Sequence, residues 1–180
     1  PLGAITEAHF DRIFDTNVRG VLFTVQKALP LLVDGASVIL TGSTASAQGT
    51  AAFSVYSASK AAVRNFARSW ALDLKDRGIR VNVVSPGPVR TPGLGGLVSD
   101  DQRQGLFDAL AAQIPLGRLG EPQEVARTVA SWRQMPPALS MRQNCLSMAE
   151  WRRCNVTLQT LWLSQQGLNR DTITKCHVAL

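Results

Sequence analysis

The sequence predicts an α/β protein that contains part of a doubly wound parallel sheet. Two short, nearly continuous apolar runs, residues 36–41 and 80–84, have the pattern of strands that are buried on both faces. Each run follows a long segment with the apolar periodicity of an amphipathic helix. The order helix, strand, helix, strand is half of a doubly wound unit, so we expect parallel strands with flanking helices.

The first predicted helix extends from about residue 6 to Leu32. Thr6 is a suitable N-cap, and the residues after it repeat apolar side chains at helical spacing. Asp34-Gly35 then predicts a turn into the first strand. The residues from Ser43 to Phe53 are mostly small and predict a loop.

A second long helix is predicted from about Ser54 to Asp76, with Gly78 as its C-terminal stop. The second strand follows directly and closes at Ser85-Pro86-Gly87-Pro88.

The segment after this strand is less regular. Residues 90–120 are rich in Gly and Asp and contain a short predicted helix at Gln102–Ile114. Glu121-Pro122-Gln123-Glu124 begins one more predicted helix.

Composition divides the chain near residue 131. Residues 1–130 carry 13 Lys+Arg and 11 Asp+Glu, a net charge of +2, whereas residues 131–180 carry 6 and 2, a net charge of +4. All three cysteines and three of the four tryptophans also fall in the second part. We therefore predict a partial α/β domain at 1–130 and an atypical, poorly ordered tail at 131–180.

Composition also excludes some classes of function. No apolar run approaches the roughly 20 residues needed to cross a bilayer, and no secretory signal opens the chain, so we expect a cytoplasmic protein without membrane contact. The pI of about 9.9 and the pair Arg152-Arg153 would suit nucleic-acid binding, but the sequence has no basic stripe or recognition motif for it. Cys145, Cys154 and Cys176 are too widely spaced for a metal knuckle, so we expect no metal site.

Tyr56-Ser57-Ala58-Ser59-Lys60 carries the most chemical information. It places the only tyrosine of the chain one helical turn before a lysine, on the same helix face. A free phenol has a pKa of about 10 and exchanges protons poorly near neutral pH. A neighbouring ammonium stabilises the phenolate, which suits the phenol to general acid or base catalysis.

The spacing Tyr-x-x-x-Lys arises often by chance, so its surroundings decide how it is interpreted. Ser43 follows the first predicted strand, thirteen residues before Tyr56, and Pro86-Gly87 follows the second. Asn17 lies in the first helix, within Asp15-Thr16-Asn17-Val18-Arg19-Gly20. Catalytic groups of α/β sheets gather at the carboxyl ends of the strands, where Ser43 and Pro86-Gly87 are predicted to lie.

Together these motifs resemble the short-chain dehydrogenase/reductase family, whose members carry an Asn, Ser, Tyr and Lys at such spacings in a Rossmann-type fold. The resemblance continues over residues 1–130, up to Pro-Leu-Gly-Arg-Leu-Gly-Glu-Pro at residues 115–122. It implies an oxidoreductase that uses NAD or NADP and acts on a small-molecule carbonyl or alcohol. It also implies a homotetramer formed through the two long helices.

The resemblance assigns roles to eight residues. Tyr56 would exchange a proton with the substrate oxygen, and Ser43 would hydrogen-bond that oxygen. Lys60 would bind the nicotinamide ribose and support ionisation of the phenol, and Asn17 would kink its helix and hold a water molecule that links Lys60 to solvent. Four residues would lie along the nicotinamide: Pro86, Gly87, Val89 and Thr91.

One feature of the family is missing from the chain. The glycine-rich turn Thr-Gly-x-x-x-Gly-x-Gly, which meets the cofactor pyrophosphate, does not occur. Thr41-Gly42 aligns with the catalytic serine instead, and Gly93-Leu94-Gly95-Gly96 lies beyond the second strand. The first residues align after four of the family's seven strands. We therefore predict an inactive fragment that binds nicotinamide cofactor poorly or not at all.

The tail departs from the family pattern as well. If it is read in a shifted frame from Trp132, suitable synonymous codons spell an ending that includes Val-Asp-Gly-Gly, as the final strand of the family does. We hypothesise a frameshift near residue 131, which codons unable to spell this ending would refute. Two alternatives remain open: a non-catalytic, degenerate remnant, and a relative that epimerises or dehydrates nucleotide sugars with the same Tyr and Lys.

Overall fold

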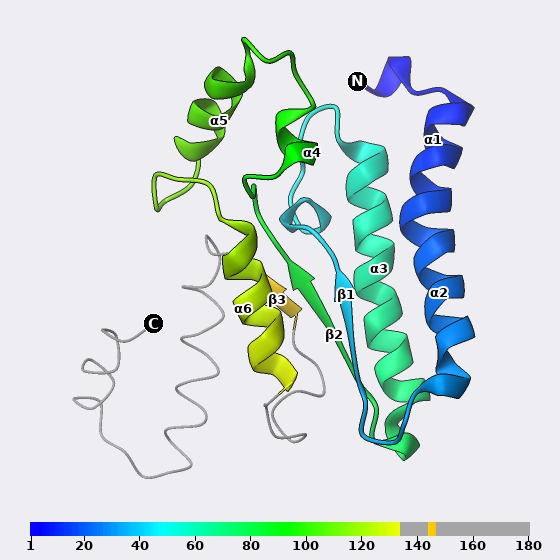
Figure 1. Ribbon diagram of the computed structural model, residues 1–180. Helices are drawn as coiled ribbons and strands as arrows, with labels where there is room; N and C mark the ends of the chain where they lie inside the picture. Colours follow the sequence, from blue (N-terminus) through cyan, green and yellow to red (C-terminus); the bar gives the residue numbers. More distant parts are fainter. Residues whose placement is uncertain (134–143, 147–180) are drawn as a thin grey trace, which may run out of the picture.

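The computed structural model describes residues 1–133 and 144–146. In this part of the chain, three parallel strands form one sheet in the order β1 (Ser37–Thr41), β2 (Arg80–Ser85), β3 (Asn144–Leu146). Helix α3 (Ser54–Asp73) covers one side of the sheet with α1 (Glu7–Phe14) and α2 (Gly20–Ala28) beyond it, and α6 (Pro122–Arg133) lies on the other side (Figure 1). The predicted α/β class and the partial doubly wound sheet are confirmed.

The first predicted helix is interrupted rather than continuous. It consists of α1 (Glu7–Phe14), a π-helical turn η2 (Asp15–Arg19), α2 (Gly20–Ala28) and a 3₁₀ turn (Leu29–Leu31). Thr6 is the predicted N-cap, because its hydroxyl accepts a hydrogen bond from the His9 N–H at 3.2 Å. The prediction of one helix over 6–32 was wrong in detail, since a wider turn keeps the helix direction and leaves no clear mark on the apolar periodicity.

Strands β1 (Ser37–Thr41) and β2 (Arg80–Ser85) pair in parallel, with Ser37 opposite Arg80 and Thr41 opposite Val84. Each lies where an apolar run predicted it. A third strand, β3 (Asn144–Leu146), pairs with β2 and lies within the segment expected to be an atypical tail. Residues 131–133 of that tail continue a helix, whereas residues 134–143 and 147–180 fall outside the described residues, and the proposed frameshift stays a hypothesis.

Helix α3 (Ser54–Asp73) is the packing centre of the domain. Its buried residues Val63, Ala67 and Ala71 join Leu40, Val81 and Val83 from the two strands in one apolar cluster. After a 3₁₀ turn at Lys75–Arg77, Gly78 adopts the left-handed conformation (φ 62°) that commonly ends a helix. The α-helical part therefore ends at Asp73, three residues before the predicted end at Asp76.

The remaining helices are shorter. Helix α4 (Pro92–Gly95) was not predicted, α5 (Arg103–Ala111) occupies most of the predicted 102–114 segment, and α6 (Pro122–Arg133) begins as expected. Arg80 ties α6 to the sheet, because its Nη1 donates to the carbonyl oxygen of the buried Trp132 at 3.0 Å. In the part of the chain that the structure describes, no helix is both long enough and apolar enough to span a bilayer.

Candidate functional site

The candidate site begins where β1 and β2 end. Gly42 follows β1 and is buried, and its N–H donates to the Val84 carbonyl at 2.7 Å. A Cβ atom at Gly42 would lie 2.6 Å from Ser85 Oγ and 2.8 Å from Val83 Cγ1. Only glycine therefore allows the two strands to stay this close, and the next residue of the chain is Ser43.

Ser43 is held in a tight turn. It caps a 3₁₀ turn, η4 (Thr44–Ser46), with its Oγ accepting a hydrogen bond from the Ala45 N–H at 3.2 Å. The Ser46 hydroxyl donates to the Ser43 carbonyl at 2.6 Å. Because the bond from Ala45 uses a lone pair of the Ser43 oxygen, the hydroxyl proton remains available to donate to a ligand.

Tyr56 and Lys60 lie one turn apart at the start of α3, as the spacing predicts. The Lys60 ammonium is 5.8 Å from the centre of the Tyr56 ring. Its Nζ donates to the Thr41 carbonyl at 3.1 Å, which ties the side chain to the end of β1, two residues before Ser43. Partial burial lowers the pKa of Lys60 from its ordinary value, because desolvation disfavours the charged form.

Asn17 contacts α3 from the layer formed by α1, η2 and α2. It lies in the π-helical turn η2, and its Nδ2 donates to Ser59 Oγ at 3.0 Å. The Ser59 hydroxyl in turn donates to the Tyr56 carbonyl at 2.7 Å. Asn17 is therefore connected to the turn of α3 that carries Tyr56 through one buried hydroxyl.

The segment expected to meet the nicotinamide is joined to the site at one end. The Pro86 carbonyl accepts a hydrogen bond from the Thr44 N–H at 3.1 Å, next to Ser43. Val89 pairs with Gly120, and Thr91 caps α4 by accepting from the Leu94 N–H at 3.2 Å. Within residues 1–133, no hydrogen bond joins Gly87, Val89 or Thr91 to Tyr56 or Lys60, nor Ser43 to Tyr56.

Sequence reasoning missed two residues of this neighbourhood. Ser59 was not singled out, although a small polar residue three positions after Tyr56 lies on a similar side of the helix. Phe53 was expected in a loop, in the region 49–53 around the substrate, but its contact with Tyr56 was not. Its ring meets the Tyr56 ring edge-on with 6.0 Å between centres, and the side chain is 42% exposed. An aromatic residue one helical turn before a candidate proton donor was the available signal.

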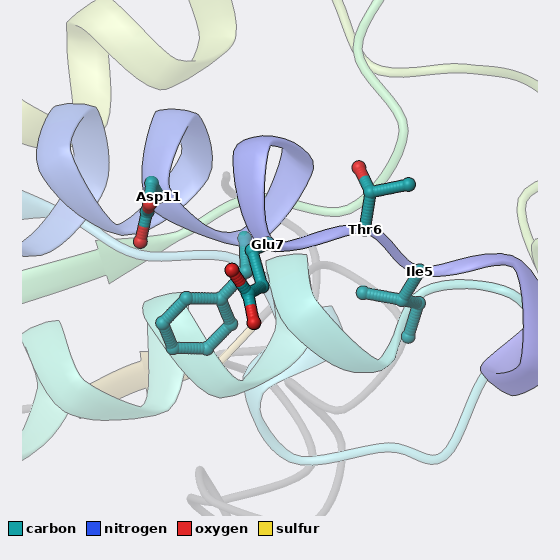
Figure 2. Close-up of a pocket in the computed structure, with 5 residues that line it drawn as sticks. Ile5, Thr6, Glu7 and Asp11 are labelled. Carbon is teal, nitrogen blue, oxygen red and sulfur yellow. The ribbon is translucent and has the colours of Figure 1, made fainter.

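Two surface hollows have linings that do not include Ser43, Tyr56 or Lys60. One, of about 410 Å³, is formed by the segment after β2, where the Arg90 guanidinium stacks 4.9 Å from the centre of the Phe107 ring. The other, of about 290 Å³, lies at the start of α1 and is shown in Figure 2. Its lining includes the carboxylates of Glu7 and Asp11 beside Ile5 and Thr6, and contains none of the predicted site residues.

Comparisons with known proteins identify the family of this chain. A family profile described as enoyl-(acyl carrier protein) reductase, from the short-chain dehydrogenases, matches residues 1–132. The chain belongs to the short-chain dehydrogenase/reductase family. The match covers β1, β2, α3 and every residue of the candidate site.

Individual relatives show the same extent of similarity. Oxidoreductase asL5 of Sarocladium schorii is 47% identical over 132 residues, which are 72% of this chain and 51% of that protein. Versicolorin reductase stcU of Emericella nidulans is 38% identical over 138 residues, covering 70% of this chain and 51% of that protein. The chain thus spans about half the length of the curated relatives it matches.

Solved structures agree on the fold. A blue fluorescent protein from a metagenomic library, in complex with NADPH, is 34% identical and superposes with a TM-score of 0.64. The match covers 72% of this chain and 51% of that one.

Proposed function

We propose that residues 1–132 form the catalytic part of an NAD(P)-dependent oxidoreductase that interconverts a small-molecule carbonyl and its alcohol. One observation carries the proposal: the Lys60 ammonium lies beside the Tyr56 ring while bonded to the end of β1, next to Ser43. The reductase names of the relatives and the NADPH in a related structure support it.

Tyr56 is the proton-transfer residue of this proposal. In the reducing direction its phenol donates a proton to the carbonyl oxygen, and in the oxidising direction the phenolate takes a proton from the alcohol. Ser43 donates its free hydroxyl proton to the same oxygen and stabilises the charge that develops there. The η4 turn limits the movement of Ser43, because its side chain and its carbonyl are both bonded within that turn.

Lys60 has two roles in this proposal. An ammonium has three N–H donors, and the Thr41 carbonyl accepts one, which leaves two for the ribose hydroxyls of a dinucleotide. Its ammonium also lies 5.8 Å from the centre of the Tyr56 ring, a cation–π contact that keeps the two side chains together. Asn17 would hold a water molecule that links Lys60 to solvent, and its η2 turn interrupts the helix as that role requires.

The donor set suits a nicotinamide cofactor at the strand ends. Pro86, Gly87, Val89 and Thr91 would line the nicotinamide, which supplies or accepts the hydride when bound. The hydrogen bond from Thr44 to Pro86 keeps the start of this segment beside Ser43. We further propose that the 180-residue chain alone binds the cofactor weakly, because its sequence lacks the glycine-rich turn for the pyrophosphate.

A hybrid protein tests the catalytic role. Residues 1–132 would replace the matching part of the NADPH-binding protein from the metagenomic library. We expect NADPH to bind, as followed by its fluorescence, and to be oxidised when a panel of aldehydes and ketones is added. Tyr56→Phe should lower turnover at least about 100-fold and keep NADPH binding, because only the proton donor is lost.

Equal turnover by the hybrid and its Tyr56→Phe form would refute the role of Tyr56. The unaltered 180-residue chain should show no measurable turnover in the same assay. Turnover by that chain would instead overturn the proposed weak cofactor binding.

The α1–α2 layer supports a proposal about assembly. Several apolar side chains there and just after it are largely exposed, including Phe10, Phe23, Leu31 and Val33. We propose that this layer joins copies of the chain, as in a tetramer of the intact protein. Size-exclusion chromatography with light scattering should give a defined oligomer, whereas a polydisperse aggregate would favour a degenerate remnant.

A further inference from the structure

Ser59 is a buried hydroxyl between the two site residues of α3. It lies three residues after Tyr56 and immediately before Lys60, and its exposed fraction is 0%. A buried hydroxyl is costly unless its hydrogen bonds are made. The partners of Ser59 therefore indicate why a polar side chain occupies this position.

Both hydrogen bonds of Ser59 are made to residues of the candidate site. Its oxygen accepts from Asn17 Nδ2 at 3.0 Å, and its proton goes to the Tyr56 carbonyl at 2.7 Å. The Asn17 amide donates to the Ser59 hydroxyl, and this hydroxyl donates to the Tyr56 carbonyl. Because the two bonds share the hydroxyl, each polarises and strengthens the other. Because serine has a single proton, the bond to Tyr56 fixes Ser59 as an acceptor toward Asn17.

The partner element is the least regular part of its layer. Asn17 lies in the π-helical turn η2, where the usual ladder of backbone bonds is interrupted, and α1, η2 and α2 contain no fully buried residue. Apolar packing therefore holds this turn weakly against α3. The bond from Asn17 to Ser59 is a specific link between the two layers beside Tyr56.

A second serine on the same helix gives a direct contrast. Ser57 Oγ is also buried, but it has no hydrogen-bond partner in the described part of the chain. Burial of a serine in this turn of α3 thus does not by itself produce a bond to the α1–α2 layer. The link belongs to Ser59 specifically.

We propose that Ser59 is a positioning residue for the proton transfer assigned to Tyr56. It bonds η2 to the first turns of α3 and so holds Asn17 beside the turn that carries Tyr56 and Lys60. This inference rests on the proposed function, because it adds a supporting residue to the same site. Ser59 acts through Tyr56 and Asn17 and does not itself meet the substrate.

The hybrid protein that tests the catalytic role also tests this inference. We expect Ser59→Ala in that protein to lower turnover at saturating NADPH at least about fivefold and to leave NADPH binding unchanged, because Asn17 is no longer held beside the site. Asn17→Leu, which removes the donor at similar size, should lower turnover in the same way.

Three further variants separate positioning from packing. Ser57→Ala should leave turnover unchanged, and Ser59→Thr should keep it because the hydroxyl is retained, even if the added methyl group lowers stability. The double variant Ser59→Ala/Asn17→Leu should lower turnover no further than the larger single change, as for residues in one network.

The proposal is overturned if Ser59→Ala lowers the urea midpoint of unfolding but leaves the turnover of the hybrid protein unchanged. If Ser59→Ala does not fold, unchanged turnover in Asn17→Leu overturns it equally. An active hybrid whose turnover neither variant lowers refutes this inference alone, whereas a hybrid without turnover refutes the proposed function as well.

Discussion

Helix α3 and the α1–α2 layer lie side by side, but they are attached to the rest of the domain in different ways. Helix α3 buries five residues, Val55, Ser59, Val63, Ala67 and Ala71, against the sheet and its neighbours. The helices α1 and α2 bury none completely, and only Val21 and Val25 of α2 pack partly on the central cluster. Apolar packing therefore fixes α3 far more firmly.

This difference matches the division of the candidate site. Tyr56 and Lys60 lie on the firmly packed helix, where the position of a proton donor is best controlled. Asn17 lies on the loosely packed layer and is connected to α3 by a polar bond. A site of this kind depends on apolar packing for one half and on hydrogen bonds for the other.

The largest expected effect is on the free energy of unfolding, when a valine of each layer is replaced by alanine. Val63→Ala removes two carbons at a position that is 0% exposed, and should lower the free energy of unfolding by about 2–3 kcal/mol. Val21→Ala on α2 should cost about 1 kcal/mol or less, because this side chain is only partly buried. Urea unfolding followed by tryptophan fluorescence measures both, and equal losses would contradict the proposed difference.

Sequence periodicity could predict the firmly packed region well. The strands at residues 36–41 and 80–84 and the start of α3 were correctly predicted, because burial on defined faces leaves a regular apolar pattern. Apolar spacing did not show the π-helical turn at Asp15–Arg19, where only the resemblance indicated a kink at Asn17, and the short helix α4 was missed. Strand β3 was missed because its three residues lie in a segment whose composition differs from the rest.

The candidate site could be predicted only in part. The approach of Lys60 to Tyr56 follows from helical spacing, and the placement of Ser43 follows from the end of a strand. The bonds from Lys60 to the Thr41 carbonyl and from Asn17 to Ser59 join residues 19 and 42 positions apart. Such contacts depend on how the layers pack, which local patterns do not encode.

An intermediate effect is expected from two left-handed residues that flank α3. Gly78 and Ala52 both have φ of 62°, a conformation that costs a non-glycine residue about 1–2 kcal/mol. Gly78→Ala should destabilise by about 1 kcal/mol from backbone strain, because no atom lies closer than 3.8 Å to the added Cβ.

Ala52→Gly should stabilise by less than about 1 kcal/mol, since relief of strain exceeds the entropy cost of glycine. Thermal unfolding of both variants provides the comparison. A loss of stability in Ala52→Gly would show that the loop before Tyr56 is not strained.

The smallest effect concerns the charge of Lys60 and depends on pH. Burial lowers the pKa of Lys60 below 10.5, so the folded state holds this proton less tightly than the unfolded chain does. The cost of the buried charge is present in full below the folded pKa, and stability rises as the pH increases through that value toward 10.5.

Lys60→Met removes this rise, so any stability gained by the variant near pH 7 should shrink as the pH approaches 10.5. The lost bond to the Thr41 carbonyl offsets part of the gain, which keeps the net change small. Urea midpoints measured from pH 7 to pH 10.5 test this, with Lys75→Met as the control because Lys75 is exposed. Parallel curves for the original chain and Lys60→Met would mean that the Lys60 ammonium stays fully hydrated, and that α3 does not hold it against the end of β1.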